Sequence, residues 1–214
     1  MIKVVLFDLD GTLTNPKEGI TKCVQYALRR FGIERECEEL ISFIGPPLKE
    51  KFMEYASLSE EDGIKAVEIY RERFAPIGLF ENELYDGILQ LLENLKKQGK
   101  VLAIATSKPT VFAEKISEKF GIAPYITLLE GSELDGRNTD KALVIKNAMQ
   151  KLGAHKENTI MVGDREHDVI GARKNGIDCI GVSYGYAADG ELEKSGALKI
   201  ADTPYELLKI LSAM

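Results

Sequence analysis

The chain has 214 residues, of which 44% are hydrophobic and 29% are charged, and its formal net charge at pH 7 is −6. A chain of this length buries roughly 70% of its extended surface, which is enough for one sizeable core and a smaller accessory unit. The acidic balance, with Lys and Arg scattered in pairs such as Arg29-Arg30, argues against a polynucleotide partner.

Cysteine usage and hydropathy bear on the compartment in which the protein works. Cys23, Cys37 and Cys179 are odd in number and lack C-x-x-C spacing, so neither a disulfide framework nor a zinc site is indicated. No apolar run approaches the ~20 residues of a membrane span, and the chain opens directly on a strand pattern rather than a leader. We therefore expect a cytoplasmic protein with no membrane partner.

The first predicted strand ends in two acids separated by one residue, in the run Val4-Val5-Leu6-Phe7-Asp8-Leu9-Asp10. Residues two apart share a face of a strand, so Asp8 and Asp10 emerge together before Gly11. Two carboxylates about 4 Å apart repel by about 4 kcal/mol at an effective dielectric of about 20. The pattern therefore favours a bound cation, with Mg²⁺ as the first candidate, and phosphoryl chemistry.

Residues 15–82 contain no convincing strand. Helical patterns cover residues 19–31, 48–55 and 60–74. An all-helical stretch of this size is an odd crossover between strands but a natural accessory domain. We expect a helical cap over 15–82, inserted into a core made of 1–14 and 83–214.

The remaining chain alternates short β-branched runs with longer helical patterns, which predicts a doubly wound, Rossmann-like parallel sheet of the α/β class. The expected strands, including the first, cover residues 2–6, 101–106, 125–130, 159–162 and 179–182. The expected helices cover residues 87–98, 110–120, 139–152 and 168–175.

Hydroxyl, basic and acidic side chains follow the ends of these strands, where open α/β sheets bind their ligands. One strand ends in Thr106-Ser107-Lys108, just before a helix whose free N–H groups favour an anion. Another ends in Gly163-Asp164, with Asp168 four residues further on. Lys141, near the start of a later helix, adds a positive charge.

Together, these motifs resemble the haloacid dehalogenase superfamily of phosphohydrolases, in the same order and over the whole chain. The helical insert after the first motif resembles the cap of the phosphoglycolate phosphatase branch. Within that branch, residues 43–48 and 131–136 look closest to bacterial phosphoglycolate phosphatases and 5′-nucleotidases. The resemblance implies a Mg²⁺-dependent phosphatase that acts on a small phosphorylated metabolite.

The resemblance also implies roles for the acids. Asp8 would be the nucleophile that forms an aspartyl-phosphate, and Asp10 the general acid and then the general base. Mg²⁺ would be held by the Asp8 side chain, the backbone carbonyl of Asp10 and Asp164. Asp168 would orient metal-bound water or Lys141. Without the resemblance, Asp164 reads as a turn residue and Asp168 as an acid at a helix N-terminus.

The implied phosphate cradle combines backbone N–H groups, hydroxyls and a cation, from Gly11, Thr12, Thr106, Ser107 and Lys141. Lys108 and Arg137 stay open as alternatives to Lys141, because Lys141 lies in a loop without the proline of many relatives. Thr106 and Ser107 also suit a simple helix cap. His167 is interpreted as non-catalytic, because neighbouring helical side chains point about 100° apart.

Within the cap, Gly45, Pro46 and Lys49 are candidates for substrate specificity, with Lys51 nearby. Equally, Pro46 and Pro47 suit the first turn of the next helix. Two other functions stay open: a phosphomutase with the same intermediate, and a phospho-acceptor signalling module. Asp10 and the cap argue against the second, because an acid two residues from a phosphoaspartate hastens its loss.

Overall fold

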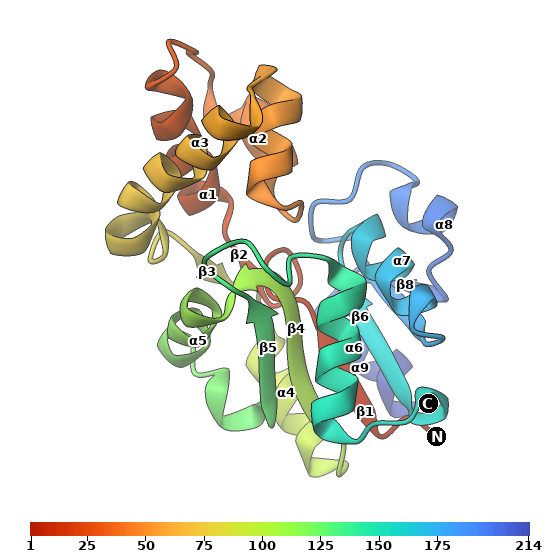
Figure 1. The fold of residues 1–214 in the computed structure, drawn as a ribbon. Coiled ribbons are helices and arrows are strands. Elements are labelled where there is room, and N and C mark those ends of the chain that lie inside the picture. Colours follow the sequence, from red (N-terminus) through yellow and green to blue (C-terminus); the bar gives the residue numbers. More distant parts are fainter. The chain divides into compact units, whose positions relative to one another are not determined.

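The computed structural model describes residues 1–214, which divide into two compact units (Figure 1). The first unit comprises residues 1–15 and 84–214, and the second comprises residues 16–83. The first unit contains a six-stranded sheet in the order β5-β4-β1-β6-β7-β8, in which every neighbouring pair is parallel. The predicted doubly wound parallel sheet is confirmed.

The central strand β1 (Val4–Phe7) is buried along its whole length and lies between β4 (Val101–Pro109) and β6 (Thr159–Gly163). Phe7 is in register with Ile104 on one side and Val162 on the other. The residues that follow these three positions therefore reach the same edge of the sheet. The outer strands are β5 (Leu128–Ser132), β7 (Asp178–Val182) and β8 (Lys199–Ala201).

Helices cover both faces of this sheet (Figure 1). On one face, α6 (Lys141–Leu152) and α7 (Glu166–Lys174) pack on a cluster that includes Leu6, Ala103 and Met161. The other helices are α4 (Ile88–Lys97), α5 (Thr110–Lys119), α8 (Glu191–Ser195) and α9 (Pro204–Ser212). Helix α4 buries Ile88, Leu91, Leu92 and Leu95, the spacing of one apolar helical stripe.

The second unit is built from α1 (Lys17–Arg29), α2 (Leu48–Ala56) and α3 (Glu60–Arg73), with a 3₁₀ segment at Cys37–Phe43. A π-helical turn, Phe74–Gly78, follows α3. Phe43 packs against Phe52 and Tyr55, with ring centroids 5.0 and 5.2 Å away. Two short strands, β2 (Thr14–Asn15) and β3 (Glu83–Leu84), form a separate two-stranded sheet.

Some elements differ from the sequence-based expectation. Strand β5 begins at Leu128 and not at Tyr125, because residues Ala123–Tyr125 form a 3₁₀ turn around Pro124. Helix α7 begins at Glu166, because the Asp168 carboxylate accepts from the backbone N–H of Arg165 at 3.1 Å. Strand β8 and helices α8 and α9 were not predicted.

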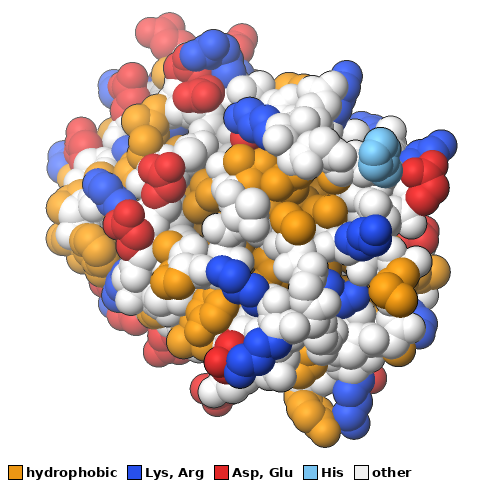
Figure 2. Space-filling model, turned by 90° about the horizontal axis from the view of Figure 1, so that it is seen from below, with side chains coloured by type: hydrophobic (Ala, Val, Ile, Leu, Met, Phe, Trp, Pro, Cys, Tyr) orange, Lys and Arg blue, Asp and Glu red, His pale blue; other side chains and the backbone are white.

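None of the helices is long and apolar enough to cross a bilayer. Figure 2 shows the face on the side of the chain termini, where Lys and Arg are interspersed with Asp and Glu around a central group of hydrophobic side chains. The basic side chains on this face form no continuous stripe.

Candidate active site

Asp8 is the first residue after β1, and two hydrogen bonds and an ion pair hold it in place. Its backbone N–H donates to the carbonyl of Val162 at 2.9 Å. Its Oδ1 accepts from the backbone N–H of Leu9 at 2.8 Å and forms an ion pair with Lys141 Nζ, also at 2.8 Å. Both the backbone and the carboxylate of Asp8 are therefore oriented before any ligand binds.

Lys141 is the first residue of α6, and its ammonium group forms two ion pairs and one hydrogen bond. Nζ lies 2.8 Å from Asp8 Oδ1, 2.9 Å from Asp168 Oδ1 and 3.2 Å from the carbonyl oxygen of Ala105. Burial lowers the pKa of Lys141, but the charges of Asp168 and Asp8 outweigh it, so the pKa is raised above its ordinary value. Lys141 is therefore a buried, permanently charged cation that crosslinks β1, β4 and α7.

Asp164 follows β6 and is fully buried. Its Oδ1 accepts from the Thr12 hydroxyl at 3.3 Å, and its Oδ2 accepts from the backbone N–H of Tyr186 at 2.9 Å. Burial and the charges of Asp168 and Asp8 raise the pKa of Asp164 well above its ordinary value. Burial also raises the pKa of Asp168, to about 6. Both carboxylates are costly to charge in the absence of a further cation.

Two glycines let the backbone approach these acids. Gly11 has φ +85°, and a Cβ atom there would lie 2.1 Å from Asp164 Oδ2. A Cβ atom at Gly163 would lie 2.1 Å from Asp168 Cγ. Any other residue at either position would displace a carboxylate of the cluster.

The acids form a cluster that suits a divalent cation. Asp8, Asp164 and Asp168 are buried, and one carboxylate oxygen from each lies within 4.8 Å of the others. Lys141 pairs with two of these acids, so three carboxyl groups share one ammonium, and negative charge is in excess when all three are ionised. Buried charges need compensation, and Mg²⁺ prefers carboxylate oxygens. The buried acids therefore fit a divalent cation such as Mg²⁺.

Asp10 has a different environment from Asp8. Its Oδ2 lies 2.5 Å from Lys108 Nζ, and its Oδ1 is buried with no hydrogen-bond partner. Burial raises the pKa of Asp10, although the Lys108 charge lowers it. The two acids of the first motif thus pair with different lysines.

The end of β4 lies beside this pair. Thr106 is buried, and its hydroxyl oxygen accepts from the backbone N–H of Lys108 at 3.3 Å. The carbonyl oxygen of Ser107 accepts from the Ser132 hydroxyl at 2.8 Å. By contrast, exposed Arg137 pairs with Asp135 at 2.7 Å, so Lys141 and not Arg137 contacts Asp8.

Comparison with known proteins decides the family. The family model described as haloacid dehalogenase-like hydrolase matches residues 5–182. The chain belongs to this family. The expected phosphoric monoester hydrolase of this family is thereby confirmed.

This haloacid dehalogenase-like hydrolase has close relatives along most of its length. It is 48% identical to a 5′-nucleotidase from Pseudomonas aeruginosa, with 88% of this chain and 86% of that protein covered. It is 37% identical to tyrosine-protein kinase PtkA from Mycobacterium tuberculosis, over 90% of this chain and 66% of that protein. The crystal structure of a predicted phosphatase from Clostridium acetobutylicum matches with a TM-score of 0.98 and 47% identity, covering both chains completely.

Sequence reasoning missed the segment after β7 in this haloacid dehalogenase-like hydrolase. The Tyr186 backbone donates to Asp164, and the Tyr184 hydroxyl donates to the carbonyl of Thr12 at 3.0 Å. A Cβ atom at Gly185 would lie 2.3 Å from Asp164 Cβ. The signal was available, because this segment also follows the carboxyl end of a parallel strand.

The cap candidates Gly45, Pro46 and Lys49 lie in the helical unit. Lys49 Nζ is 3.1 Å from Glu60 Oε1 and 3.9 Å from Glu50 Oε1. Pro47 is the N-cap residue of α2, which begins at Leu48, so neither proline lies within the first turn of the helix. A role for these residues in substrate specificity remains a prediction.

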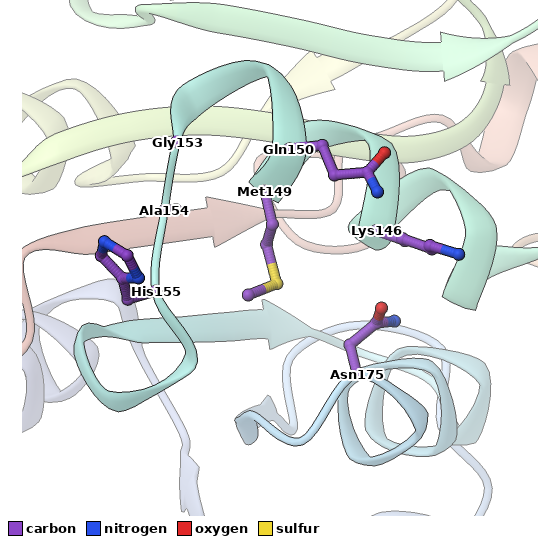
Figure 3. Close-up of a pocket in the computed structure, with 7 residues that line it drawn as sticks. All are labelled: Lys146, Met149, Gln150, Gly153, Ala154, His155 and Asn175. Carbon is purple, nitrogen blue, oxygen red and sulfur yellow. The ribbon is translucent and has the colours of Figure 1, made fainter.

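An open pocket of about 320 Å³ lies elsewhere on the first unit (Figure 3). It lies at the C-terminal end of α6, about 12 Å along the helix from Lys141. Its lining residues are Lys146, Met149, Gln150, Gly153, Ala154, His155 and Asn175. No member of the acid cluster lines this pocket, so it is separate from the candidate active site.

Proposed function

We propose that the protein is a Mg²⁺-dependent phosphatase that hydrolyses small phosphomonoesters through an aspartyl-phosphate on Asp8. The observation that carries the proposal is the buried cluster of Asp8, Asp164 and Asp168, in which three acids share the one ammonium of Lys141. Such a cluster supplies a carboxylate nucleophile and a place for a divalent cation at the same edge of the sheet.

In the first step, the Asp8 carboxylate attacks phosphorus and the bond between phosphorus and the ester oxygen breaks. Asp10 donates a proton to the departing oxygen, which suits the raised pKa of this buried carboxyl. The positive charge of Lys141 and the N–H groups of the cradle stabilise the phosphoryl oxygens. When bound, Mg²⁺ neutralises the negative charge that the phosphate brings to Asp8 and Asp164.

In the second step, water attacks the phosphorus of the aspartyl-phosphate and the bond to Asp8 breaks. Asp10, now ionised, takes a proton from that water. The residue therefore serves as acid and then as base within one turnover. Asp168 keeps Lys141 in position through the 2.9 Å ion pair.

The helical unit, residues 16–83, acts in this proposal as the cap that selects the substrate and excludes water from the charged site. The substrate class is supported by the similarity to the 5′-nucleotidase and by the resemblance of residues 43–48 and 131–136 to phosphoglycolate phosphatases. We expect 5′-nucleotides and phosphoglycolate to be the best substrates.

The test is a phosphate-release screen with Mg²⁺ against phosphoglycolate, 5′-nucleotides, sugar phosphates and pyrophosphate. The wild-type protein should turn over at least one small monoester, and EDTA should abolish the activity. Asp8→Asn should be folded and inactive. Substantial Mg²⁺-dependent activity of this variant would refute Asp8 as the nucleophile.

The same protein also tests the two alternatives. After incubation with acetyl phosphate, a long-lived adduct on Asp8 would indicate a phospho-acceptor module. Transfer of the phosphoryl group to a second hydroxyl of a sugar phosphate would indicate a phosphomutase. Rapid release of inorganic phosphate in both assays is the result expected of a phosphatase.

A further inference from the structure

We propose that Lys108 is a positioning residue for Asp10. By holding one carboxylate oxygen, it leaves the other as the atom that exchanges the proton with the leaving group and then with water. This inference rests on the proposed function, because it concerns the acid–base step of that reaction. It gives Lys108 a task distinct from that of Lys141.

The geometry of the pair carries the inference. Lys108 Nζ lies 2.5 Å from Asp10 Oδ2, and the side chains of Lys108 and Asp10 are only 6% and 12% exposed. Asp10 Oδ1 is buried and accepts no hydrogen bond. A buried polar atom without a partner costs free energy and calls for an explanation. An oxygen kept available for the leaving group and for water supplies one.

The backbone that carries Lys108 is held by its neighbours. Its N–H donates to Thr106 Oγ1 at 3.3 Å. On the β5 side, the Ser132 hydroxyl donates to Ser107 O at 2.8 Å, and Ser132 O accepts from the Thr110 hydroxyl at 3.3 Å. A Cβ atom at Gly131 would lie 2.6 Å from the carbonyl oxygen of Lys108, so only glycine allows this close approach. The lysine therefore starts from a rigid position, as a positioning residue must.

The two lysines divide the acids between them. Lys141 bonds to Asp8 and Asp168, whereas Lys108 bonds to Asp10. When the ester oxygen takes the proton from Asp10, the resulting carboxylate is left beside the ammonium of Lys108. When water then bonds to phosphorus and the bond to Asp8 breaks, the same carboxylate receives the proton. Lys108 thus stabilises and orients Asp10 between the two steps without touching the reacting phosphoryl group.

A double-mutant cycle on kcat/KM tests this assignment. The variants are Lys108→Met, Asp10→Asn and the double substitution, assayed with an alkyl phosphate substrate and with p-nitrophenyl phosphate, whose leaving group needs little protonation. Lys108→Met should lower kcat/KM for the alkyl phosphate by about tenfold or more, and by about threefold or less for p-nitrophenyl phosphate. In the Asp10→Asn background, Lys108→Met should lower kcat/KM for the alkyl phosphate by about threefold or less. The asparagine of that background cannot transfer the proton, so its position no longer matters for this step.

Lys151→Met is the matched control, since Lys151 pairs with Glu130 at 2.6 Å and its own side chain is 59% exposed. It should leave kcat/KM unchanged with both substrates. Thermal unfolding identifies variants that are not folded, and Lys108→Gln replaces Lys108→Met in the cycle if the methionine variant is not.

Two results would overturn the inference. An equal loss with both substrates would assign Lys108 a structural role, and an equal loss in the wild-type and Asp10→Asn backgrounds would assign it a direct contact with the substrate phosphate. Failure of the proposed function looks different: the wild-type protein would release no phosphate, or Asp8→Asn would remain active.

Discussion

The ammonium group of Lys141 lies 2.8 Å from Asp8 Oδ1, which links the first turn of α6 to the end of the central strand. The same group bonds to Asp168 at 2.9 Å, so one cation holds two buried acids from separate elements. The geometry of the acid cluster therefore depends on Lys141, which is on α6, whereas the proposed metal ligands Asp8 and Asp164 follow β1 and β6.

Replacing Lys141 with Met is expected to destabilise the protein by about 3–5 kcal/mol, because removal of one partner leaves buried charge uncompensated. Urea unfolding monitored by circular dichroism measures this change. Lys97→Met, which removes an exposed lysine paired with exposed Glu93, should cost about 1 kcal/mol or less. Similar losses for the two variants would show that the Lys141 ion pairs contribute little.

Gly11→Ala is expected to weaken Mg²⁺ binding, since the new Cβ would lie 2.1 Å from Asp164 Oδ2. We expect a loss of about tenfold or more in Mg²⁺ affinity, as for other changes that displace a metal ligand. Isothermal titration calorimetry measures the affinity directly.

Gly121→Ala is the matched control for this prediction. Gly121 also has a positive φ, of +68°, but a Cβ there would meet nothing within 4 Å. This variant should lose about 1 kcal/mol of stability from backbone strain and keep its Mg²⁺ affinity. If both variants bind Mg²⁺ equally well, the close packing of Gly11 on Asp164 does not matter for the metal.

Mg²⁺ should stabilise the protein more at about pH 8 than at about pH 5.5, because protons compete with the metal for its carboxylate ligands. Burial raises the pKa of Asp164 and, to about 6, that of Asp168. Between the ordinary carboxyl pKa of about 4 and these raised values, the metal-free folded state binds more protons than the unfolded state. These two groups therefore make the metal-free protein less stable as the pH rises through that window.

Thermal unfolding with and without Mg²⁺ at the two pH values provides the measurement. The rise in Tm on adding Mg²⁺ should be larger at the higher pH. An equal or larger rise at the lower pH would contradict the carboxylate cluster as the binding site.

The sequence predicted the parts of the site that depend on strand ends. The burial of Val4–Phe7 and the alternation of Asp8 with Asp10 are local patterns, and the parallel arrangement brings Thr106 and Asp164 to the same edge. The choice among Lys141, Lys108 and Arg137 was open, because the reach of a long side chain depends on how α6 and the β4 loop pack. In the structure, Lys141 pairs with Asp8 and Asp168, and Lys108 pairs with Asp10. Arg137 pairs with exposed Asp135.

The C-terminal third of the core was harder to predict. Strand β8 is three residues long and α8 is five, too short for a periodic pattern. Tyr186 contributes its backbone N–H, which any residue except proline would supply, so only its place after β7 could have indicated its bond to Asp164. These are contacts of tertiary packing, whereas the acids themselves belong to local motifs.

The most direct test of the proposed mechanism is to find the phosphoryl group on the enzyme. The protein is mixed with Mg²⁺ and a substrate identified by the screen, quenched in acid during turnover, digested and mapped by mass spectrometry. We predict a phosphorylated peptide containing Asp8 that hydroxylamine dephosphorylates and that is missing from Asp8→Asn. Turnover with no phosphoryl group on this peptide, or with one on another residue, would contradict the proposed mechanism.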